Sequence, residues 1–343
     1  MNLHFSRNNS PADKLIDRLI ALIGNVHHPE IVREMIIASL KAGLEDEEKA
    51  DLKLMNSTLK EMRFTAKVFG PYSTVRKVTV FGSARTRQNE PVYAMARELG
   101  RGLAASGYMV ITGAGPGIMQ AVNEGAGPDN SFGVNIRLPF EQRPNPVLEG
   151  NPRLITYKYF FNRKVAFLKE AHAIALFPGG FGTLDEAMET LTLVQTGKRD
   201  PLPLVLVDEP GGLYWAKWLR FFEDELLAEG YITASDFNLF ERVDSVSAVI
   251  KRINHFYRRY HSLRHVARQL VIRLTSNISL QAVSELNSLF ADMLISGGRI
   301  VLSGPLPEEA DEPEIAHLPR LVMDFNNRDF GRLRSLINIV NDY

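Results

Sequence analysis

Residues 173–186 read AIALFPGGFGTLDE, and this stretch decides the class of fold. Its first five side chains are small or apolar, as in a strand that is buried on both faces. A glycine-rich turn follows, and an amphipathic run then continues to Gln195. A buried strand that leads through glycines into a helix is typical of a parallel α/β sheet.

The same alternation of patterns extends to both sides of this stretch. Short apolar runs predict strands at Lys77–Phe81, Tyr108–Thr112, Gly133–Leu138, Ala173–Phe177 and Pro203–Val207. Amphipathic runs predict helices at Pro91–Ala105, Ile118–Glu124, Tyr157–Ala171, Thr183–Gln195 and Leu213–Glu229. We therefore expect an α/β core over residues 74–260, in which helices cover both faces of a parallel sheet.

The two flanks of this core have different patterns. Residues 1–73 carry apolar side chains at helical spacing after the helix-start signal Ser10-Pro11-Ala12-Asp13, and they predict an N-terminal helical segment for packing or dimerisation. Residues 266–343 predict a small α+β accessory domain. Its expected elements are strands at Leu270–Leu274, Arg299–Leu302 and Arg320–Phe325, and helices at Leu280–Ile295 and Phe330–Val340.

A basic and aromatic run, Arg252–Arg268, joins the core to the accessory domain. It indicates a solvated helix or a domain junction, and contact with nucleic acid or a phosphorylated effector is the alternative interpretation. His261 and His265 are one helical turn apart, but Ser262 stands where a zinc protease needs a glutamate. We therefore expect no metal site.

Composition excludes several classes of protein. The 343 residues leave room for about two domains, and 40 Lys and Arg balance 40 Asp and Glu, which argues against a protein that coats nucleic acid or an anionic membrane. The absence of cysteine excludes disulfides, thiolate catalysis and iron–sulfur clusters. Neither a membrane-spanning run nor a signal peptide is evident, so we expect a cytoplasmic protein without a membrane partner.

Ligands of such sheets bind beyond the carboxyl ends of the strands, where three loops rich in glycine or small residues lie. The loop Phe81–Arg85 brings backbone N–H groups and the Ser83 hydroxyl near a ligand, although a plain tight turn explains it equally well. The loop with Gly113, Gly115 and Gly117 suits a phosphate or ribose at a helix N-terminus. It is not the dinucleotide fingerprint, because Ile118 stands where that pattern needs glycine, and no Walker lysine follows.

The third loop, Pro178–Glu186, is the most informative. Gly179, Gly180 and Gly182 allow the backbone to curl around an anion, and Thr183 offers a hydroxyl where the helix begins. The helix dipole adds roughly half a positive charge at that end. This loop predicts a phosphate site.

Two charged side chains are candidates for chemistry at this loop. Glu186 lies three residues after Thr183, so the pair is either a capping box or an arrangement that aims a carboxylate at the ligand. Arg163 falls in the N-terminal half of the preceding expected helix, which lies near the same edge of the sheet. Arg163 is either a surface residue beside Lys164 or a partner of Glu186 in one pocket.

Four segments together resemble the LOG (Lonely Guy) family, whose members were long labelled lysine decarboxylases. They are Phe81-Gly-Ser-Ala-Arg85, Gly113-Ala-Gly-Pro-Gly-Ile-Met119, Tyr159-Phe-Phe-Asn-Arg-Lys164, and Pro178–Glu186 followed by Leu191-Thr-Leu-Val-Gln-Thr-Gly197. The resemblance covers about residues 74–250. It implies a Rossmann-like fold, a homodimer or higher oligomer, no cofactor, and a small nucleotide as the partner.

The resemblance also implies an activity and its residues. Phosphoribohydrolases of this family cleave the N-glycosidic bond of nucleoside 5′-monophosphates, such as AMP or the cytokinin riboside monophosphates of cytokinin biosynthesis. Carried over, Arg163 and Glu186 form the catalytic pair, and the phosphate cradle and nucleotide contacts are Gly179, Gly180, Gly182, Thr183, Ser83, Gly113, Gly115 and Gly117. Ala114 departs from the family, where a third glycine is common.

The individual roles stay open at this point. Glu186 either holds the ribose hydroxyls or activates water, and Arg163 balances charge on the phosphate or on the leaving base. The alternative function is a non-catalytic carrier that binds a nucleotide or the molybdenum cofactor in the same cradle. A carrier needs the cradle alone, whereas the presence of both Arg163 and Glu186 favours the enzyme. In a third interpretation, residues 266–343 sense a nucleotide and regulate the core.

Overall fold

The computed structural model describes residues 11–45, 48–139 and 143–343. The chain divides into two compact units, one that ends at Phe64 and one that comprises Thr65–Tyr343. The expected helix cap Ser10 lies outside the described residues. The longest N-terminal helix, α3 (Lys49–Phe69), contains the division between the units.

The first unit is helical, as predicted. Helices α1 (Pro11–Ile23) and α2 (Pro29–Glu45) precede α3. Arg33 of α2 is buried and forms ion pairs with Asp13 and Asp17 of α1, which join the two helices. Many large apolar side chains of these helices are exposed, among them Leu15, Leu22, Ile23, Leu40 and Leu44.

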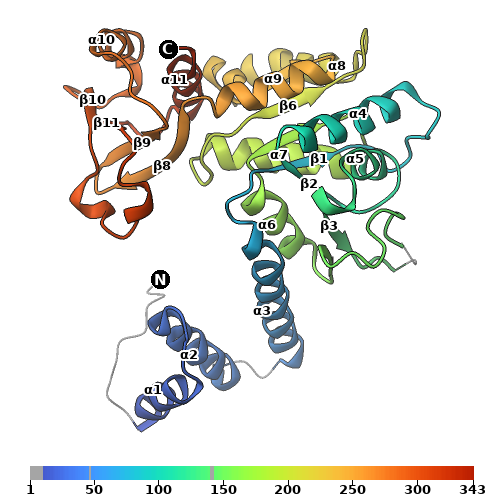
Figure 1. The fold of residues 1–343 in the computed structure, drawn as a ribbon, viewed down its shortest axis with the longest axis vertical. Helices are drawn as coiled ribbons and strands as arrows, with labels where there is room; N and C mark the ends of the chain where they lie inside the picture. Colours follow the sequence, from blue (N-terminus) through green and yellow to red (C-terminus); the bar gives the residue numbers. More distant parts are fainter. Residues whose placement is uncertain (1–10, 46–47, 140–142) are drawn as a thin grey trace. The chain divides into compact units, whose positions relative to one another are not determined.

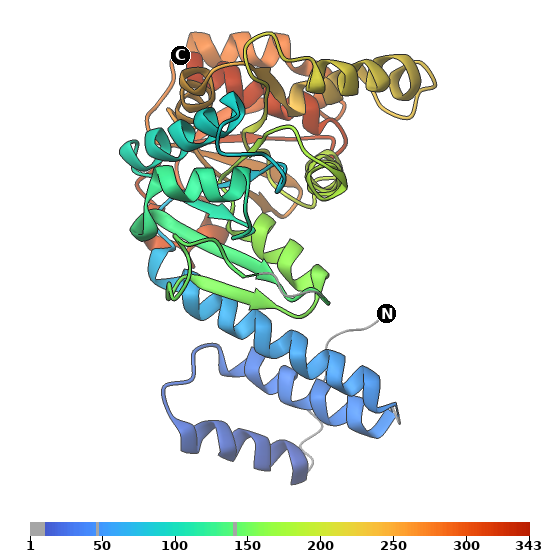
Figure 2. The ribbon, with the colours of Figure 1, turned by 90° about the vertical axis from the view of Figure 1, so that its right-hand side faces the viewer.

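The second unit contains a seven-stranded parallel sheet with helices on both faces, which confirms the predicted fold class (Figures 1 and 2). Its strands are β1 (Lys77–Phe81), β2 (Met109–Thr112), β3 (Ser131–Ile136), β4 (Leu154–Tyr157), β5 (Ala173–Leu176), β6 (Leu204–Val207) and β7 (Glu241–Val243). Their order across the sheet is β4-β3-β2-β1-β5-β6-β7. The chain therefore builds one half of the sheet outward from β1 and then returns to begin the other half at β5, which makes the β1–β5 boundary a topological switch point.

Two of these strands were missed in the sequence. They are the edge strands β4, seen beside β3 among the green arrows of Figure 2, and β7. The prediction of a helix from Tyr157 was wrong at its start, because Leu154–Tyr157 pairs with β3 and helix α6 (Phe160–Glu170) begins later. An edge strand is covered less and is not a continuous apolar run, so its pattern is weak.

Alternate residues of each strand point to opposite faces of the sheet and form two cores. Helices α4 (Pro91–Ala105), α5 (Ile118–Ala126) and α9 (Val246–Phe256) cover one face, against Val78, Val110 and Val205. Helices α6, α7 (Phe181–Gln195) and α8 (Tyr214–Phe221) cover the other, against Ile111 and Ile174. The expected helix Leu213–Glu229 is regular only to Phe221 and continues as a π-helical turn, η3 (Phe222–Leu227).

Residues beyond α9 form a second, antiparallel sheet in the order β10-β11-β9-β8, of which β8 was missed in the sequence. Its strands are β8 (Tyr260–Val266), β9 (Gln269–Leu274), β10 (Ile300–Ser303) and β11 (Arg320–Met323), and it is accompanied by α10 (Leu280–Leu289) and α11 (Phe330–Asp342). The helical spacing assigned to His261 and His265 was wrong, because both lie on strand β8. The predicted junction around residues 252–268 is thus the end of α9 and the strand that follows it.

Helix α11 packs back against the larger sheet's helices, and Figure 1 shows it beside α9. Its Gly331 lies against the backbone of Ser235 in the 3₁₀ turn η4 (Ala234–Leu239), so closely that a β-carbon would come within 2.0 Å of the Ser235 carbonyl oxygen. The Asn341 side chain accepts the Tyr260 N–H at 2.9 Å and donates to the Phe256 carbonyl at 2.6 Å. These contacts join α11, α9 and β8 within one compact unit.

A buried ion network connects the small sheet to the acidic loop before β11. Glu309 accepts from Arg273 of β9 at 2.7 Å and from Arg320 of β11 at 3.2 Å, and all three side chains are almost fully buried. Burial opposes ionisation of Glu309, but the Leu306 amide and the two guanidinium groups outweigh it and lower the pKa of this carboxyl. The carboxylate therefore compensates the buried Arg320 and, together with Glu312, the buried Arg273.

Removal of that charge should destabilise the second unit. We expect Glu309→Gln to lower the free energy of unfolding by about 3–5 kcal/mol, since it leaves the buried Arg320 without its carboxylate partner and leaves Arg273 with Glu312 alone. Urea unfolding measures this loss. Glu308→Gln, a change of the exposed neighbouring residue, is the matched control; an equal effect of the two variants would show that the network contributes nothing specific.

Candidate active site

Three loops meet at the carboxyl edge of the sheet, beside the switch point. They follow β1, β2 and β5, and the backbone of Ser83 joins them. The Ser83 N–H donates to the Pro178 carbonyl at 3.1 Å, and the Ser83 carbonyl accepts the N–H of Ile118 at 3.1 Å. One peptide segment therefore fixes the relative positions of all three predicted loops.

A cavity of about 690 Å³ opens between these loops and the start of α6. Of the predicted site residues, it is lined by Ser83, Gly113, Arg163, Gly179, Gly180, Gly182, Thr183 and Glu186. The structure thus brings Arg163 and Glu186, which are remote in sequence, into one pocket. Gly115 and Gly117 are not among its lining residues.

Gly115 and Gly117 lie in the turn between β2 and α5. The Gly115 carbonyl accepts from the Asn145 side chain at 3.1 Å. Gly117 has φ +68°, and a β-carbon there would lie 2.3 Å from the Ser83 carbonyl oxygen. Only glycine allows this approach, so Gly117 makes the Ser83–Ile118 hydrogen bond possible.

Ala114 occupies the position where the family commonly has glycine, and its backbone explains that preference. Its φ is +59°, in the left-handed region where a β-carbon is unfavourable by roughly 1–2 kcal/mol. Its N–H donates to the Thr112 hydroxyl at 3.1 Å and its carbonyl accepts the Asn145 N–H at 2.7 Å. These two hydrogen bonds hold the alanine in a conformation that suits glycine better.

Arg163 reaches into the cavity from the first turns of α6. Its Nε donates to the Val134 carbonyl of β3 at 2.9 Å, and its guanidinium lies 5.0 Å from the centre of the Phe167 ring. A β-carbon on Gly113 would come within 2.5 Å of the Arg163 Nη2, so glycine at this position leaves room for the guanidinium. Burial lowers the pKa of Arg163, against the raising effects of Glu186 and Tyr157.

Glu186 is a buried carboxylate, and the capping-box interpretation was wrong. Helix α7 begins at Phe181 with Gly180 as its N-cap, and no side chain caps it. Only 6% of Glu186 is exposed, and its Oε2 has no hydrogen-bond partner within the part of the chain that the structure describes. Burial is the main cause that raises the pKa of Glu186 to about 7. The charges of Glu189 and Asp185 raise it further, whereas those of Lys164 and Arg163 lower it.

Lys164 is the functional candidate that the sequence did not single out. Its Nζ lies 2.8 Å from Asp185, 2.7 Å from Glu189 and 3.8 Å from the Glu186 Oε2. It therefore compensates three carboxylates of α7. Its position one residue after Arg163 was the sequence feature that could have identified it.

Tyr214 was also missed in the sequence. Its hydroxyl donates to the Gly179 carbonyl at 2.7 Å and holds the third loop.

No cluster of three or more His, Asp or Glu suited to a metal ion occurs among residues 11–45, 48–139 and 143–343. Over the same ranges, no helix is both long and apolar enough to cross a membrane.

Fold and site together define a Rossmann-like α/β protein with an arginine and a protonatable carboxylate at the switch point of its sheet. The family model described as "Possible lysine decarboxylase" matches residues 118–253. The cytokinin riboside 5′-monophosphate phosphoribohydrolase LOG3 of Arabidopsis thaliana is 26% identical over 190 residues, 54% of this chain and 84% of that protein. These matches confirm the resemblance to the LOG family.

A bacterial relative is similar over a shorter region. The pyrimidine/purine nucleotide 5′-monophosphate nucleosidase of Escherichia coli strain K12 is 33% identical over 131 residues, 34% of this chain. The chain covers 28% of that protein's length. Among solved structures, the molybdenum cofactor binding protein of Rippkaea orientalis matches 52% of this chain and 96% of its own, at 20% identity and a TM-score of 0.35, a likeness too distant to bear on function.

The raised pKa of Glu186 predicts a pH-dependent cost in stability. The folded state resists ionisation of this carboxyl, so the cost is absent below the ordinary pKa of about 4.5 and is complete above about 7. Glu186→Gln, which resembles the protonated form, should raise the free energy of unfolding at pH 8 by on the order of 1–3 kcal/mol and by much less at pH 5. Urea unfolding at the two pH values measures the difference.

A control separates this effect from a general effect of charge. Glu229→Gln changes an exposed carboxylate and should leave stability nearly unchanged at both pH values. If Glu186→Gln gave the same change at pH 5 as at pH 8, burial of the ionised form would not be the cause.

Proposed function

We propose that the protein hydrolyses the N-glycosidic bond of nucleoside 5′-monophosphates, giving a free base and ribose 5-phosphate. The observation that carries the proposal is the buried Glu186 carboxyl, which shares a cavity with Arg163 and has an oxygen without a hydrogen-bond partner among the described residues. A carboxyl buried in this way is unfavourable for folding. It makes chemical sense as a group that acts on a bound ligand.

The loop that begins α7 fits the phosphate of such a substrate. Gly179, Gly180 and Gly182 line the cavity beside the N-terminus of a 15-residue helix, where backbone N–H groups and the helix dipole attract an anion. The buried Thr183 adds a hydroxyl at the same place. Glu186 lies one turn further along the helix, so a phosphate at the loop leaves the ribose as the part of the substrate that faces the carboxylate.

The reaction breaks the bond between C1′ of the ribose and the base nitrogen. Water supplies the hydroxyl that C1′ gains and the proton that the base gains, so no other reactant is needed. The transition state carries positive charge on the ribose ring, which a nearby carboxylate stabilises. In this proposal, ionised Glu186 stabilises that charge and accepts the proton of the attacking water, while Arg163 neutralises negative charge on the phosphate or the leaving base.

The names of the relatives support this substrate class. Both the plant phosphoribohydrolase and the bacterial nucleosidase are named for nucleoside 5′-monophosphates. AMP and cytokinin riboside 5′-monophosphates are therefore the substrates we propose to test first. The proposed enzyme is a homodimer or higher homo-oligomer, and the exposed Phe160 and Phe181, which line the cavity, are apolar surface that a second copy would cover.

The direct test is release of free base. Purified protein is incubated with AMP, GMP, UMP and isopentenyladenosine monophosphate, and the products are separated by chromatography. We expect release from at least one monophosphate, and a loss of kcat/KM on the order of 10²–10³-fold in Glu186→Gln and in Arg163→Met. Glu98→Gln and Arg101→Met on the exposed side of α4 are the matched controls and should retain activity.

The same preparations distinguish the enzyme from a carrier. Calorimetry with each monophosphate measures binding in the absence of turnover. Tight binding without release of base from any monophosphate would contradict the proposal and support a carrier. Melting temperatures of the variants show whether a lost activity reflects a lost fold.

The pKa of Glu186 predicts the pH profile of the reaction. If its ionised form is required, kcat/KM falls about tenfold per pH unit below about pH 7. A phosphate monoester also titrates near pH 6, so the assignment needs a variant. Lys164 lowers the pKa of Glu186, and Lys164→Met should therefore move the acid limb to higher pH, whereas a limb that stays in place would identify the substrate phosphate as the titrating group.

A further inference from the structure

A second cavity lies at the opposite edge of the large sheet. Its volume is about 900 Å³, within the usual range for small-molecule sites. Segments that precede β1, β2, β5 and β6 line it, together with the end of α9 and the start of β8, so it lies at the amino ends of the strands. All of these segments belong to the second compact unit.

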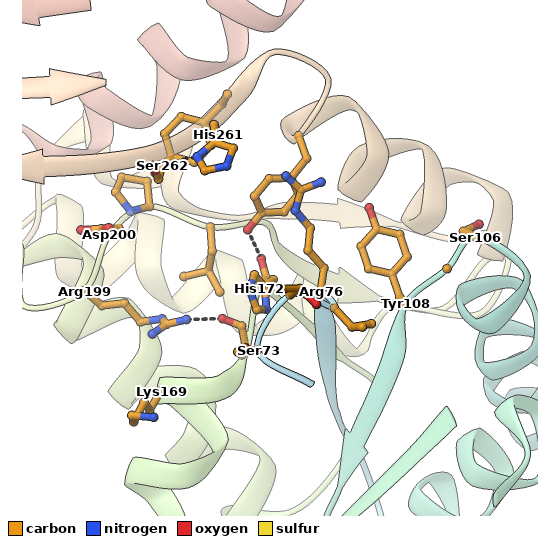
Figure 3. Close-up of a pocket in the computed structure, with 18 of the residues that line it drawn as sticks. Ser73, Arg76, Ser106, Tyr108, Lys169, His172, Arg199, Asp200, His261 and Ser262 are labelled. Carbon is orange, nitrogen blue, oxygen red and sulfur yellow. Dashed lines mark hydrogen bonds between the residues drawn. The ribbon is translucent and has the colours of Figure 1, made fainter. Parts of the chain in front are cut away.

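The lining of this cavity is strongly basic. Four side chains carry a permanent positive charge, namely Arg76, Lys169, Lys198 and Arg199, and Asp200 is the single carboxylate among the lining residues. Figure 3 shows Arg76, Arg199 and His261 reaching the cavity from different elements. Outside the lining, Glu170 pairs with Lys169 at 2.6 Å.

Helix ends explain only part of this positive charge. Lys169 lies in the last turn of α6, and Arg199 donates to the Ala171 carbonyl just beyond that helix, where cations are favourable. Lys198 lies two residues after Thr196, the C-cap of α7, and its amide donates to the Leu193 carbonyl, so this cation also lies at a helix end. Arg76 precedes β1 and has no such role. Among the described residues, Arg76 contacts the face of the Tyr257 ring at 4.1 Å, and no ion pair or hydrogen bond is found for the exposed Lys198 side chain.

Two further observations indicate unbalanced positive charge. The buried Nε of Arg199 has no hydrogen-bond partner among residues 11–45, 48–139 and 143–343. Burial lowers the pKa of His172 to about 4, with further lowering by Lys77, Arg76 and Arg199. Burial likewise lowers the pKa of His261, again with a contribution from Arg76.

We propose that this cavity binds a small molecule that carries a diphosphate group, through Arg76, Lys198 and Arg199. A diphosphate offers several anionic oxygens to cations that come from separate elements, and guanidinium groups bind phosphate oxygens in pairs. The group can belong to inorganic pyrophosphate or to a nucleoside diphosphate. The site is separate from the candidate active site, and its existence does not depend on the proposed reaction.

Calorimetry on the full chain tests the proposal, with pyrophosphate, ADP and ribose 5-phosphate as probes. We expect pyrophosphate or ADP to bind, and the double variant Arg76→Gln/Lys198→Gln to weaken that binding at least tenfold. The double variant Arg220→Gln/Lys251→Gln removes the same charge from exposed positions elsewhere and should change the affinity less than twofold. Binding of pyrophosphate alone identifies the bare diphosphate as the ligand, and binding of ADP alone shows that the nucleoside is also required.

A second comparison locates the bound probe. Arg163→Met alters the candidate active site and should leave the binding affected by Arg76→Gln/Lys198→Gln unchanged. Affinity that falls with Arg163→Met and not with the double variant would overturn the proposal, as would the absence of binding of both pyrophosphate and ADP at 10 mM, a concentration on the order of the weakest useful affinities. Circular dichroism of each variant confirms that it is folded, and Lys198→Glu, at an exposed position, provides a second variant if the double variant fails to fold.

Discussion

The peptide segment at Ser83 is the constraint on which the candidate site depends. Its N–H holds the loop after β5 through Pro178, and its carbonyl holds the start of α5 through Ile118. Both bonds require close approach of three backbones, and Gly117 at φ +68° makes one of these approaches possible. The loop after β1, whose sequence is equally typical of a plain turn, therefore fixes the positions of the two glycine-rich loops relative to each other.

That framework supports an electrostatic arrangement that is unfavourable for stability. Glu186 is buried with a raised pKa, and Arg163 is buried with a lowered pKa. For each group, the loss of hydration therefore disfavours the charged form more than the neighbouring opposite charges favour it. Lys164 reduces the cost by lying among the three carboxylates of α7 without making a hydrogen bond to Glu186. A carboxylate kept short of partners in this way remains available to a ligand, which is the trade between stability and function expected of active sites.

The sequence predicted the parts of the fold that are buried on both sides. Strands β1, β2 and β5 are short and mostly apolar, and all their residues are buried. Their common direction predicts that Arg163 and Glu186 lie at one edge of the sheet. The edge strand β7, Glu-Arg-Val, carries charged residues and was missed. The sequence predicts a solvated helix or a domain junction where strand β8 lies, because its basic and aromatic residues have no clear period, and only pairing with β9 decides its conformation.

Contacts that depend on tertiary structure could not be predicted at all. The start of α7 illustrates this, because Thr183 and Glu186 match a capping box, yet Gly180 begins the helix and the carboxylate turns toward the cavity. Local sequence cannot decide between these two arrangements, since they differ in whether Glu186 bonds to its own backbone or faces Arg163 from another helix.

The two edges of the sheet also differ in how they can attract an anion. Helix N-termini supply positive potential at the carboxyl edge, whereas at the amino edge helix C-termini are negative, so any anion there must be held by side chains such as Arg76 and Lys198. The neutral total of the chain conceals that local surplus of positive charge.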